Sequence, residues 1–209
     1  MGVHEVLKNI TWLGHDGFLI KGDGKVIVID PFQLKECEPA DLILITHEHY
    51  DHCSPDDVKK VQKPSTVIVT EADSAKKLTG DIRVVAPGDK LTVSGIPIEV
   101  VPAYNTNKKF HPKRNGWLGF IVTVDGVRLY HAGDTDLIPE MDSLKADIAL
   151  LPVSGTYVMT AEEAVEAAKR IKPEIAIPMH YGAIVGSAED ALRFSDALAG
   201  TCEVVVLSR

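Results

Sequence analysis

The chain has 209 residues, of which 45% are hydrophobic and 25% charged, and its formal net charge is −8. This balance is typical of a globular protein with a sizeable core, and the acidic charge argues against broad electrostatic binding of nucleic acid, which depends on many Lys and Arg contacts to phosphate. The three cysteines form no CxxC pair, so neither a disulfide framework nor a thiolate zinc site is indicated. The N-terminus lacks a signal-peptide pattern and no apolar run approaches the ~18 residues of a membrane span, so we expect a cytoplasmic protein.

In the first half of the chain, short β-rich segments alternate with turn signals. Gly22-Asp23-Gly24 is typical of a hairpin turn. Ser54 is predicted to cap a helix that has Pro55 at its first position, and Thr70 to cap a second helix that ends at about Leu78. The strands predicted in this half span residues 10–13, 17–21, 26–29, 41–45, 66–69, 83–85, 91–93 and 96–101.

The second half begins with a long polar loop over residues 103–117, a length that usually marks a functional or mobile segment. Thr160 and Glu163 form a capping box that opens a helix ending near Ile171, and Ser187 begins a last helix. The strands predicted in this half span residues 119–124, 127–131, 147–151, 175–178 and 203–207.

Each half therefore offers hairpin strands followed by strand–helix alternation. Two such halves can place two sheets face to face with helices outside, which predicts an α/β fold of the four-layer αββα sandwich type. No Ser/Gly-rich linker interrupts the chain, so we expect residues 1–209 to form a single domain.

The most specific motif is His47-x-His49-x-Asp51-His52, which directly follows the apolar run 41–45. In an extended segment His47 and His49 point to the same side and can bind one ion. Asp51 and His52 are adjacent, so their side chains diverge unless the chain turns between them. The helix that begins just after them requires such a turn. With that turn, the two side chains would bind a second ion ~3.5–4 Å from the first. Imidazole and carboxylate are the ligands that zinc prefers after thiolate. The alternative is a polar loop with surface histidines.

Two further candidate ligands follow strands in the second half. Asp134 comes after Gly133, where the backbone can approach closely, and its carboxylate can bridge two ions. The alternative is an ordinary turn aspartate. His180 closes the apolar strand 175–178, and the alternative there is a half-buried histidine with a structural role.

Other residues are less specific candidates. His111 either completes the first ion's ligands, binds substrate, or is an exposed loop histidine. The basic residues around it form either a solvated loop or a rim that binds an anion; they are Lys108, Lys109, Lys113 and Arg114.

Four residues are candidates for lining the pocket or orienting ligands. His15 ends a strand-like piece, and Asp30 can orient a ligand imidazole through a hydrogen bond or simply begin a turn. His131 faces either the core or Asp134. Tyr157 belongs to a segment that either walls the pocket or only connects a strand to a helix.

The HxHxDH run, followed by Gly133-Asp134-Thr135 and His180, resembles the metallo-β-lactamase fold superfamily. The early segments Trp12–His15 and Ile29–Phe32 are most similar to its branch of small metal-dependent hydrolases, which includes the ascorbate-6-phosphate lactonase-like proteins. The resemblance implies an αββα sandwich of two mixed sheets with one or two divalent ions at its edge. Its ligand assignment is His47 and His49 for the first ion, Asp51, His52 and His180 for the second, and Asp134 for the bridge.

The sequence departs from this family at Asn105, where a third histidine for the first ion is usual. Three explanations are open: His111 folds back to take that place, the first site is weak, or the ion favours oxygen ligands. The cofactor is therefore expected to be zinc, with manganese as the alternative.

We expect a metal-dependent hydrolase in which a metal lowers the pKa of a bound water and Asp51 holds that water. The expected substrate is a small ester, lactone or amide, with an anionic group accommodated if the basic loop faces the site. The alternatives are a phosphodiesterase or nuclease, and a metal-binding protein without turnover, which Asn105 keeps open. A small molecule is the expected partner, membrane and nucleic acid are not, and the sequence does not indicate the oligomeric state.

Overall fold

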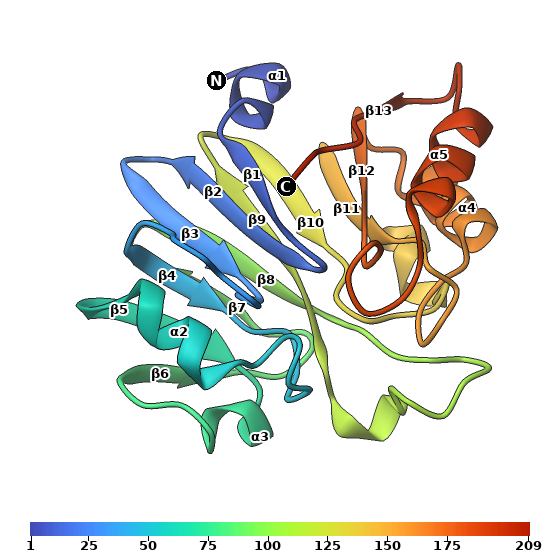
Figure 1. Cartoon of the computed structure of the whole chain (residues 1–209). Coiled ribbons are helices and arrows are strands. Elements are labelled where there is room, and N and C mark those ends of the chain that lie inside the picture. Colours follow the sequence, from blue (N-terminus) through green and yellow to red (C-terminus); the bar gives the residue numbers. More distant parts are fainter.

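The computed structural model describes all residues, 1–209, and contains two β-sheets with helices on their outer sides (Figure 1). The first sheet has the strand order β1-β2-β3-β4-β5-β6 and the second the order β13-β12-β11-β10-β9-β8-β7. Both sheets are mixed, because antiparallel hairpins at one side are joined to parallel strands at the other. The predicted αββα sandwich of two mixed sheets is confirmed.

The strands are short, as the sequence pattern predicted. Those of the first sheet are β1 (Ile10–Gly14), β2 (Gly17–Gly22), β3 (Lys25–Ile29), β4 (Ala40–Leu44), β5 (Gln62–Thr70) and β6 (Asp81–Val84). Those of the second are β7 (Lys90–Val93), β8 (Ile96–Pro102), β9 (Leu118–Val124), β10 (Val127–His131), β11 (Ile148–Pro152), β12 (Ile175–Met179) and β13 (Glu203–Val204).

Neighbouring side chains along a strand point to opposite faces of the sheet, and this divides the hydrophobic core into two clusters. Ile27 and Ile29 of β3 join the main cluster of 47 buried residues, to which both sheets contribute. Val28 of β3 and Ile43 of β4 point the other way and pack with Val58 of helix α2 (Pro55–Val61) in a smaller cluster. Successive side chains of a strand face opposite sides of its sheet, so the central strands β3 and β4 are covered on both faces.

In Figure 1, α2 and α3 (teal) lie against the first sheet, and α4 and α5 (orange and red) lie against the second. The helices are α1 (Val3–Leu7), α2 (Pro55–Val61), α3 (Ala72–Ala75), α4 (Ala161–Ile171) and α5 (Ala188–Ala197), with short 3₁₀ helices η1 (Lys113–Asn115) and η2 (Pro139–Ser143). The predicted caps Ser54, Thr160 and Ser187 are confirmed, and Thr160 forms the expected capping box with Glu163. None of these helices has the length and hydrophobicity needed to span a bilayer.

Several local expectations were wrong. Helix α1 was not predicted, and α3 is capped by Glu71 rather than Thr70 because the Glu71 carboxylate accepts hydrogen bonds from the backbone N–H groups of Asp73 and Ser74. The last strand pairs only over Glu203 and Val204. The loop 103–117 is not uniformly polar and solvated, since it buries five side chains: Ala103, Tyr104, Asn105, His111 and Trp117.

The parallel strands place their carboxyl ends at one edge of the sandwich. β3 pairs in parallel with β4, β10 pairs in parallel with β11, and β11 pairs in parallel with β12. The chain emerging from these strands carries Asp30, His47, Asp134 and His180 respectively from β3, β4, β10 and β12. Ligands commonly bind where the carboxyl ends of parallel strands converge, and this edge holds the candidate site.

Candidate metal centre

The first group of ligand-type side chains consists of His47, His49 and His111. One nitrogen from each lies within 4.8 Å of the others, and Nε2 of His47 is 3.0 Å from Nδ1 of His49. His47 and His111 are buried, and the rings of all three contact Trp117. The loop 103–117 therefore brings His111 to the place where a third histidine was missing from the sequence pattern.

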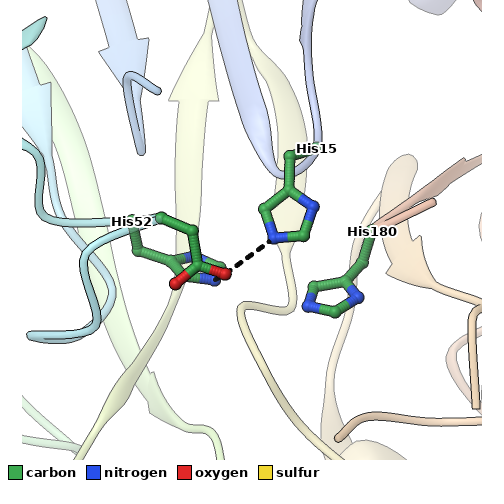
Figure 2. A group of neighbouring side chains, drawn as sticks. His15, His52 and His180 are labelled. Carbon is green, nitrogen blue, oxygen red and sulfur yellow. Dashed lines mark hydrogen bonds and ion pairs between the residues drawn. The ribbon is translucent and has the colours of Figure 1, made fainter. Parts of the chain in front are cut away.

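A second group lies beside the first and consists of His15, Asp51, His52 and His180, whose ligand atoms are also within 4.8 Å of one another. Figure 2 shows the imidazoles of His15, His52 and His180 approaching one another from three separate loops. The ring centroids of His15 and His180 are 4.3 Å apart, and Nε2 of His15 is 3.1 Å from Oδ2 of Asp51.

Asp134 lies between the two groups. Its Oδ2 is 3.1 Å from Nε2 of His111 in the first group and 3.3 Å from Nε2 of His180 in the second, and its Oδ1 is 3.3 Å from Nε2 of His52. The turn that presents it needs glycine, because Gly133 has a φ of +62° and a Cβ there would lie 2.5 Å from the carbonyl oxygen of Leu118. Asp134, which the sequence predicted as a bridging ligand, thus lies within reach of residues of both groups.

The donor atoms fit divalent metal ions. Nε2 of His52, Nε2 of His111 and Oδ1 of Asp134 are buried, and their contacts of 3.1 and 3.3 Å lack the geometry of hydrogen bonds. Leaving such atoms unpaired costs free energy unless another group meets their lone pairs. Burial lowers the pKa of His47 and of His49, which keeps both imidazoles in the neutral form that binds metals. A divalent cation bound among these residues would satisfy the unpaired atoms.

Asp30 holds the His52 ring in place. Its Oδ2 is 2.8 Å from Nδ1 of His52 and accepts a hydrogen bond of 2.6 Å from the Thr46 hydroxyl, while its Oδ1 accepts one of 2.8 Å from the Thr46 backbone N–H. The carboxylate thus directs Nε2 of His52 toward Asp134, the arrangement that commonly orients metal-binding histidines. Asp30, His15 and His180 have positive φ values of 43°, 53° and 60°, and such strain is often concentrated at functional sites.

Asn105 is buried, and its side chain faces His111. Its Oδ1 accepts a hydrogen bond of 2.9 Å from the His111 backbone N–H and lies 3.2 Å from Nδ1 of that ring. Its Nδ2 donates to the Tyr157 carbonyl at 2.8 Å and to Oδ1 of Asp136 at 3.1 Å. Asn105 therefore holds the His111 ring in place beside His47 and His49.

Two residues of the site escaped the sequence analysis. Asp16 is completely buried, its carboxylate groups with His52, Asp134 and His180, and both its oxygens lack partners. Burial and the neighbouring Asp134 raise the pKa of Asp16 well above its usual value. Ser154 has its hydroxyl 2.9 Å from Nδ1 of His180. The only signal for Asp16 was its place beside His15, and nothing distinguished Ser154.

His131 belongs to neither group of ligand atoms, but its ring contacts the backbone of two segments that carry site residues. Its Nδ1 accepts a hydrogen bond of 3.2 Å from the Gly133 backbone N–H, so its Nε2 carries the proton and donates to the Asp16 carbonyl at 2.9 Å. Of the two sequence alternatives, His131 faces the core and fixes the turn before Asp134.

The basic loop residues do not line the site. Lys108 contacts Asp136 at 2.6 Å and Lys113 contacts Glu140 at 2.9 Å, whereas Lys109 and Arg114 are exposed. A pocket of about 250 Å³ opens above the site, and its lining contains no Lys or Arg: His49, Tyr50, Asp51, Phe110, His111, Asp134, Tyr157 and Ile184. A larger hollow of about 410 Å³ beside Tyr104 and Lys113 contains none of the grouped ligand residues.

Comparison with known proteins identifies relatives over nearly the whole chain. Residues 9–180 match the family model described as the beta-lactamase superfamily domain. A protein of Thermoplasma acidophilum, named a UPF0173 metal-dependent hydrolase, is 36% identical over 95% of this chain and 93% of its own.

Two solved structures extend this likeness to three dimensions. A protein of Parabacteroides distasonis, provisionally described as a metal-dependent hydrolase, is 39% identical with a TM-score of 0.85, over 95% of this chain and 93% of that one. A metallo hydrolase of Ignicoccus hospitalis is 27% identical with a TM-score of 0.77, over 95% and 94% of the two chains.

Proposed function

Because the chain belongs to the metallo-β-lactamase superfamily, as a metal-dependent hydrolase, we propose that it cleaves a small ester, lactone or amide at a site that holds two divalent ions. The observation that carries the proposal is the position of Asp134 between two groups of ligand atoms, directly beneath a pocket. Its carboxylate can contact an ion in each group at once.

We assign His47, His49 and His111 to the first ion, Asp51, His52 and His180 to the second, and Asp134 to both. The grouping of ligand atoms within 4.8 Å supports each set. Three imidazoles around the first ion favour zinc, whereas manganese prefers oxygen ligands, so zinc is the proposed metal. If the site holds only one ion, the residues that surround that ion are drawn from this same set.

Divalent ions held by these residues would supply an activated water near neutral pH and polarise the carbonyl of the substrate. Asp51 lines the pocket, and its Oδ2 lies 3.1 Å from Nε2 of His15. As a ligand of the second ion, its carboxylate would lie next to the water bound there and would accept the proton of that water. Burial by itself would raise the pKa of Asp51, but the hydrogen bond from His15 and the charge of His52 outweigh burial and lower it. The carboxylate is therefore ionised, as a proton acceptor must be. Asp51 would then return the proton to the leaving group.

No particular observation favours phosphodiester hydrolysis, since no Lys or Arg lines the pocket to hold a second phosphate oxygen. A metal-binding protein without turnover is the remaining alternative, and the following comparison separates it from the proposed hydrolase.

The test compares wild type with Asp51→Ala on phenyl acetate, a δ-lactone, an anilide and bis-p-nitrophenyl phosphate, with metal content measured for each protein. We expect Asp51→Ala to lower kcat on an ester or lactone about 10²- to 10⁴-fold, the usual effect of losing a proton-transfer group. Asp56→Ala is the matched control, because that carboxylate is 93% exposed. A wild type that binds metal yet equals Asp51→Ala on every substrate would rule out the proposal.

A further inference from the structure

Hydrophobic side chains that are exposed to solvent concentrate at the mouth of the pocket. The chain exposes eight large hydrophobic side chains, and half of them line this one pocket: Tyr50, Phe110, Tyr157 and Ile184, which are 67%, 53%, 36% and 39% exposed. Scattered exposed hydrophobic residues need no explanation, but a contiguous set around a concave site usually marks a binding surface.

These four side chains come from three separate loops and the segment after His180, and aromatic contacts hold three of them. The rings of Phe110 and Tyr157 meet edge to face with centroids 4.5 Å apart, and Tyr50 packs in the same way on Phe32 at 5.8 Å. Edge-to-face contacts of this kind fix the ring orientation. We call the four side chains Tyr50, Phe110, Tyr157 and Ile184 the wall of the pocket. Its three aromatic rings are therefore held in position before any ligand binds.

The charges around the pocket complete the description. The other four lining residues are the candidate ligands His49, Asp51, His111 and Asp134, so no Lys or Arg lines the pocket. Lys108 and Lys113 of the loop 103–117 are paired with acids. An anionic group pressed against the aromatic wall would lose its hydration and find no cation there, which is costly.

Resting on the proposed function, we propose that this pocket selects substrates by an uncharged apolar substituent next to the scissile bond, such as an aryl or short branched alkyl group. The volume of about 250 Å³ lies just below the roughly 300–1,000 Å³ typical of sites for drug-sized ligands. It suits one ring or a short chain. Phe110, Tyr157, Tyr50 and Ile184 determine this specificity.

The first test measures binding without turnover. Zinc-loaded protein is titrated calorimetrically with 4-phenylbutanohydroxamic acid and with succinic acid monohydroxamate, which share the metal-binding group but end in a phenyl ring or a carboxylate. We expect the phenyl compound to bind at least about tenfold more tightly, since burial of apolar area favours it and the carboxylate loses hydration. Equal binding, or tighter binding of the carboxylate compound, would overturn the proposal.

Substitutions in the wall test whether its side chains cause the preference for the phenyl compound. Phe110→Ala should reduce the ratio of the two affinities several-fold, and Phe110→Lys should bring it to one or below by adding a cation. Leu192→Ala is the control, because Leu192 is an exposed hydrophobic residue of α5 outside the pocket. The assignment fails if Leu192→Ala changes the ratio as much as Phe110→Ala does.

A turnover measurement separates this proposal from the one on which it rests. We expect kcat/KM for p-nitrophenyl butyrate to exceed that for the mono-p-nitrophenyl ester of succinate, and to rise roughly threefold to fourfold per methylene from acetate to butyrate. If no ester is cleaved at all, the hydrolytic proposal fails, while the affinity ratio of the two hydroxamates still decides the chemistry of the pocket.

Discussion

At the scale of single residues, Asn105 shows how a departure from a motif can be compensated nearby. The sequence places Asn105 where a third histidine is expected, and the structure turns its side chain to hold His111, six residues later, with contacts of 2.9 and 3.2 Å. The Tyr157 carbonyl is 3.2 Å from the same ring nitrogen. One of the three explanations, substitution by His111, is thus the one that the geometry supports.

Replacing Asn105 should leave the His111 ring present but less firmly oriented. We expect Asn105→Ala to weaken binding of the first ion about 10- to 100-fold, the usual cost of losing a partner that orients a metal ligand, and His111→Ala to weaken it further. Metal titration with a competing chelator measures both. Asn107→Ala, an exposed neighbour in the same loop, should bind like wild type, and wild-type affinity in Asn105→Ala would contradict the role assigned to it.

Single residues could be singled out from the sequence where their chemistry and spacing were local, and not where only burial in the folded chain distinguishes them. The HxHxDH run stood out because histidines and carboxylates directly follow a buried strand. Asp16 did not, because only the tertiary structure shows that it is completely buried beside Asp134. The proximity of His15 to Asp51 was equally invisible, since the two lie 36 positions apart.

At the scale of elements, Asp57 of helix α2 fastens the loop after β3 to the loop after β4. Its carboxylate accepts hydrogen bonds from the backbone N–H groups of Gln33 (2.8 Å) and Leu34 (3.0 Å), and from Ser54 (2.8 Å) and Lys60 (2.8 Å). These loops carry the residues that follow Asp30 and those of the HxHxDH motif. The carboxylate therefore supports the site from the outer layer.

We expect Asp57→Asn to lower the free energy of unfolding at pH 7 by about 1–3 kcal/mol, because the backbone N–H groups of Gln33 and Leu34 lose a charged acceptor. Burial by itself would raise the pKa of Asp57, but Lys60 and the hydrogen bonds to Ser54, Leu34 and Gln33 outweigh it and lower the pKa. A lowered pKa means that the stabilisation is present above the unfolded pKa of about 3.9 and is lost as pH falls through the folded value.

Urea unfolding at pH 7 and at pH 3 measures this difference for wild type, Asp57→Asn and the exposed control Asp56→Asn. The gap between wild type and Asp57→Asn should narrow at pH 3. A gap that is the same at both pH values, or an equal loss in Asp56→Asn, would contradict the role of the charged carboxylate.

Elements with local signals were predicted well. Helices α2 and α4 begin where their caps and first-turn residues indicated, because a cap is a contact between neighbours in sequence. The loop 103–117 was expected to be polar and turned out to be folded, because Asp136 accepts hydrogen bonds from the backbone N–H groups of Thr106 and Asn107 and pairs with Lys108. Contacts across about 30 positions leave no trace in local sequence.

At the scale of the whole molecule, two sheets share one main core and place their parallel strand ends at a common edge. The alternation of strands and helices was enough to predict the four layers, and the resemblance in the motifs predicted where the edge lies. The shared core supports the proposal that residues 1–209 form one domain. The first group of ligand atoms comes from the loops after β4 and β8, and the second from both sheets.

Metal-dependent hydrolysis is tested most directly by adding zinc to the metal-free protein while following cleavage of phenyl acetate. Because two groups of ligand atoms meet at Asp134, we expect activity to be absent without metal, to rise with added zinc, and to reach its plateau at about two ions per chain, in line with a two-metal site. Activity that persists in the metal-free protein, or none at any amount of zinc or manganese, would contradict the account.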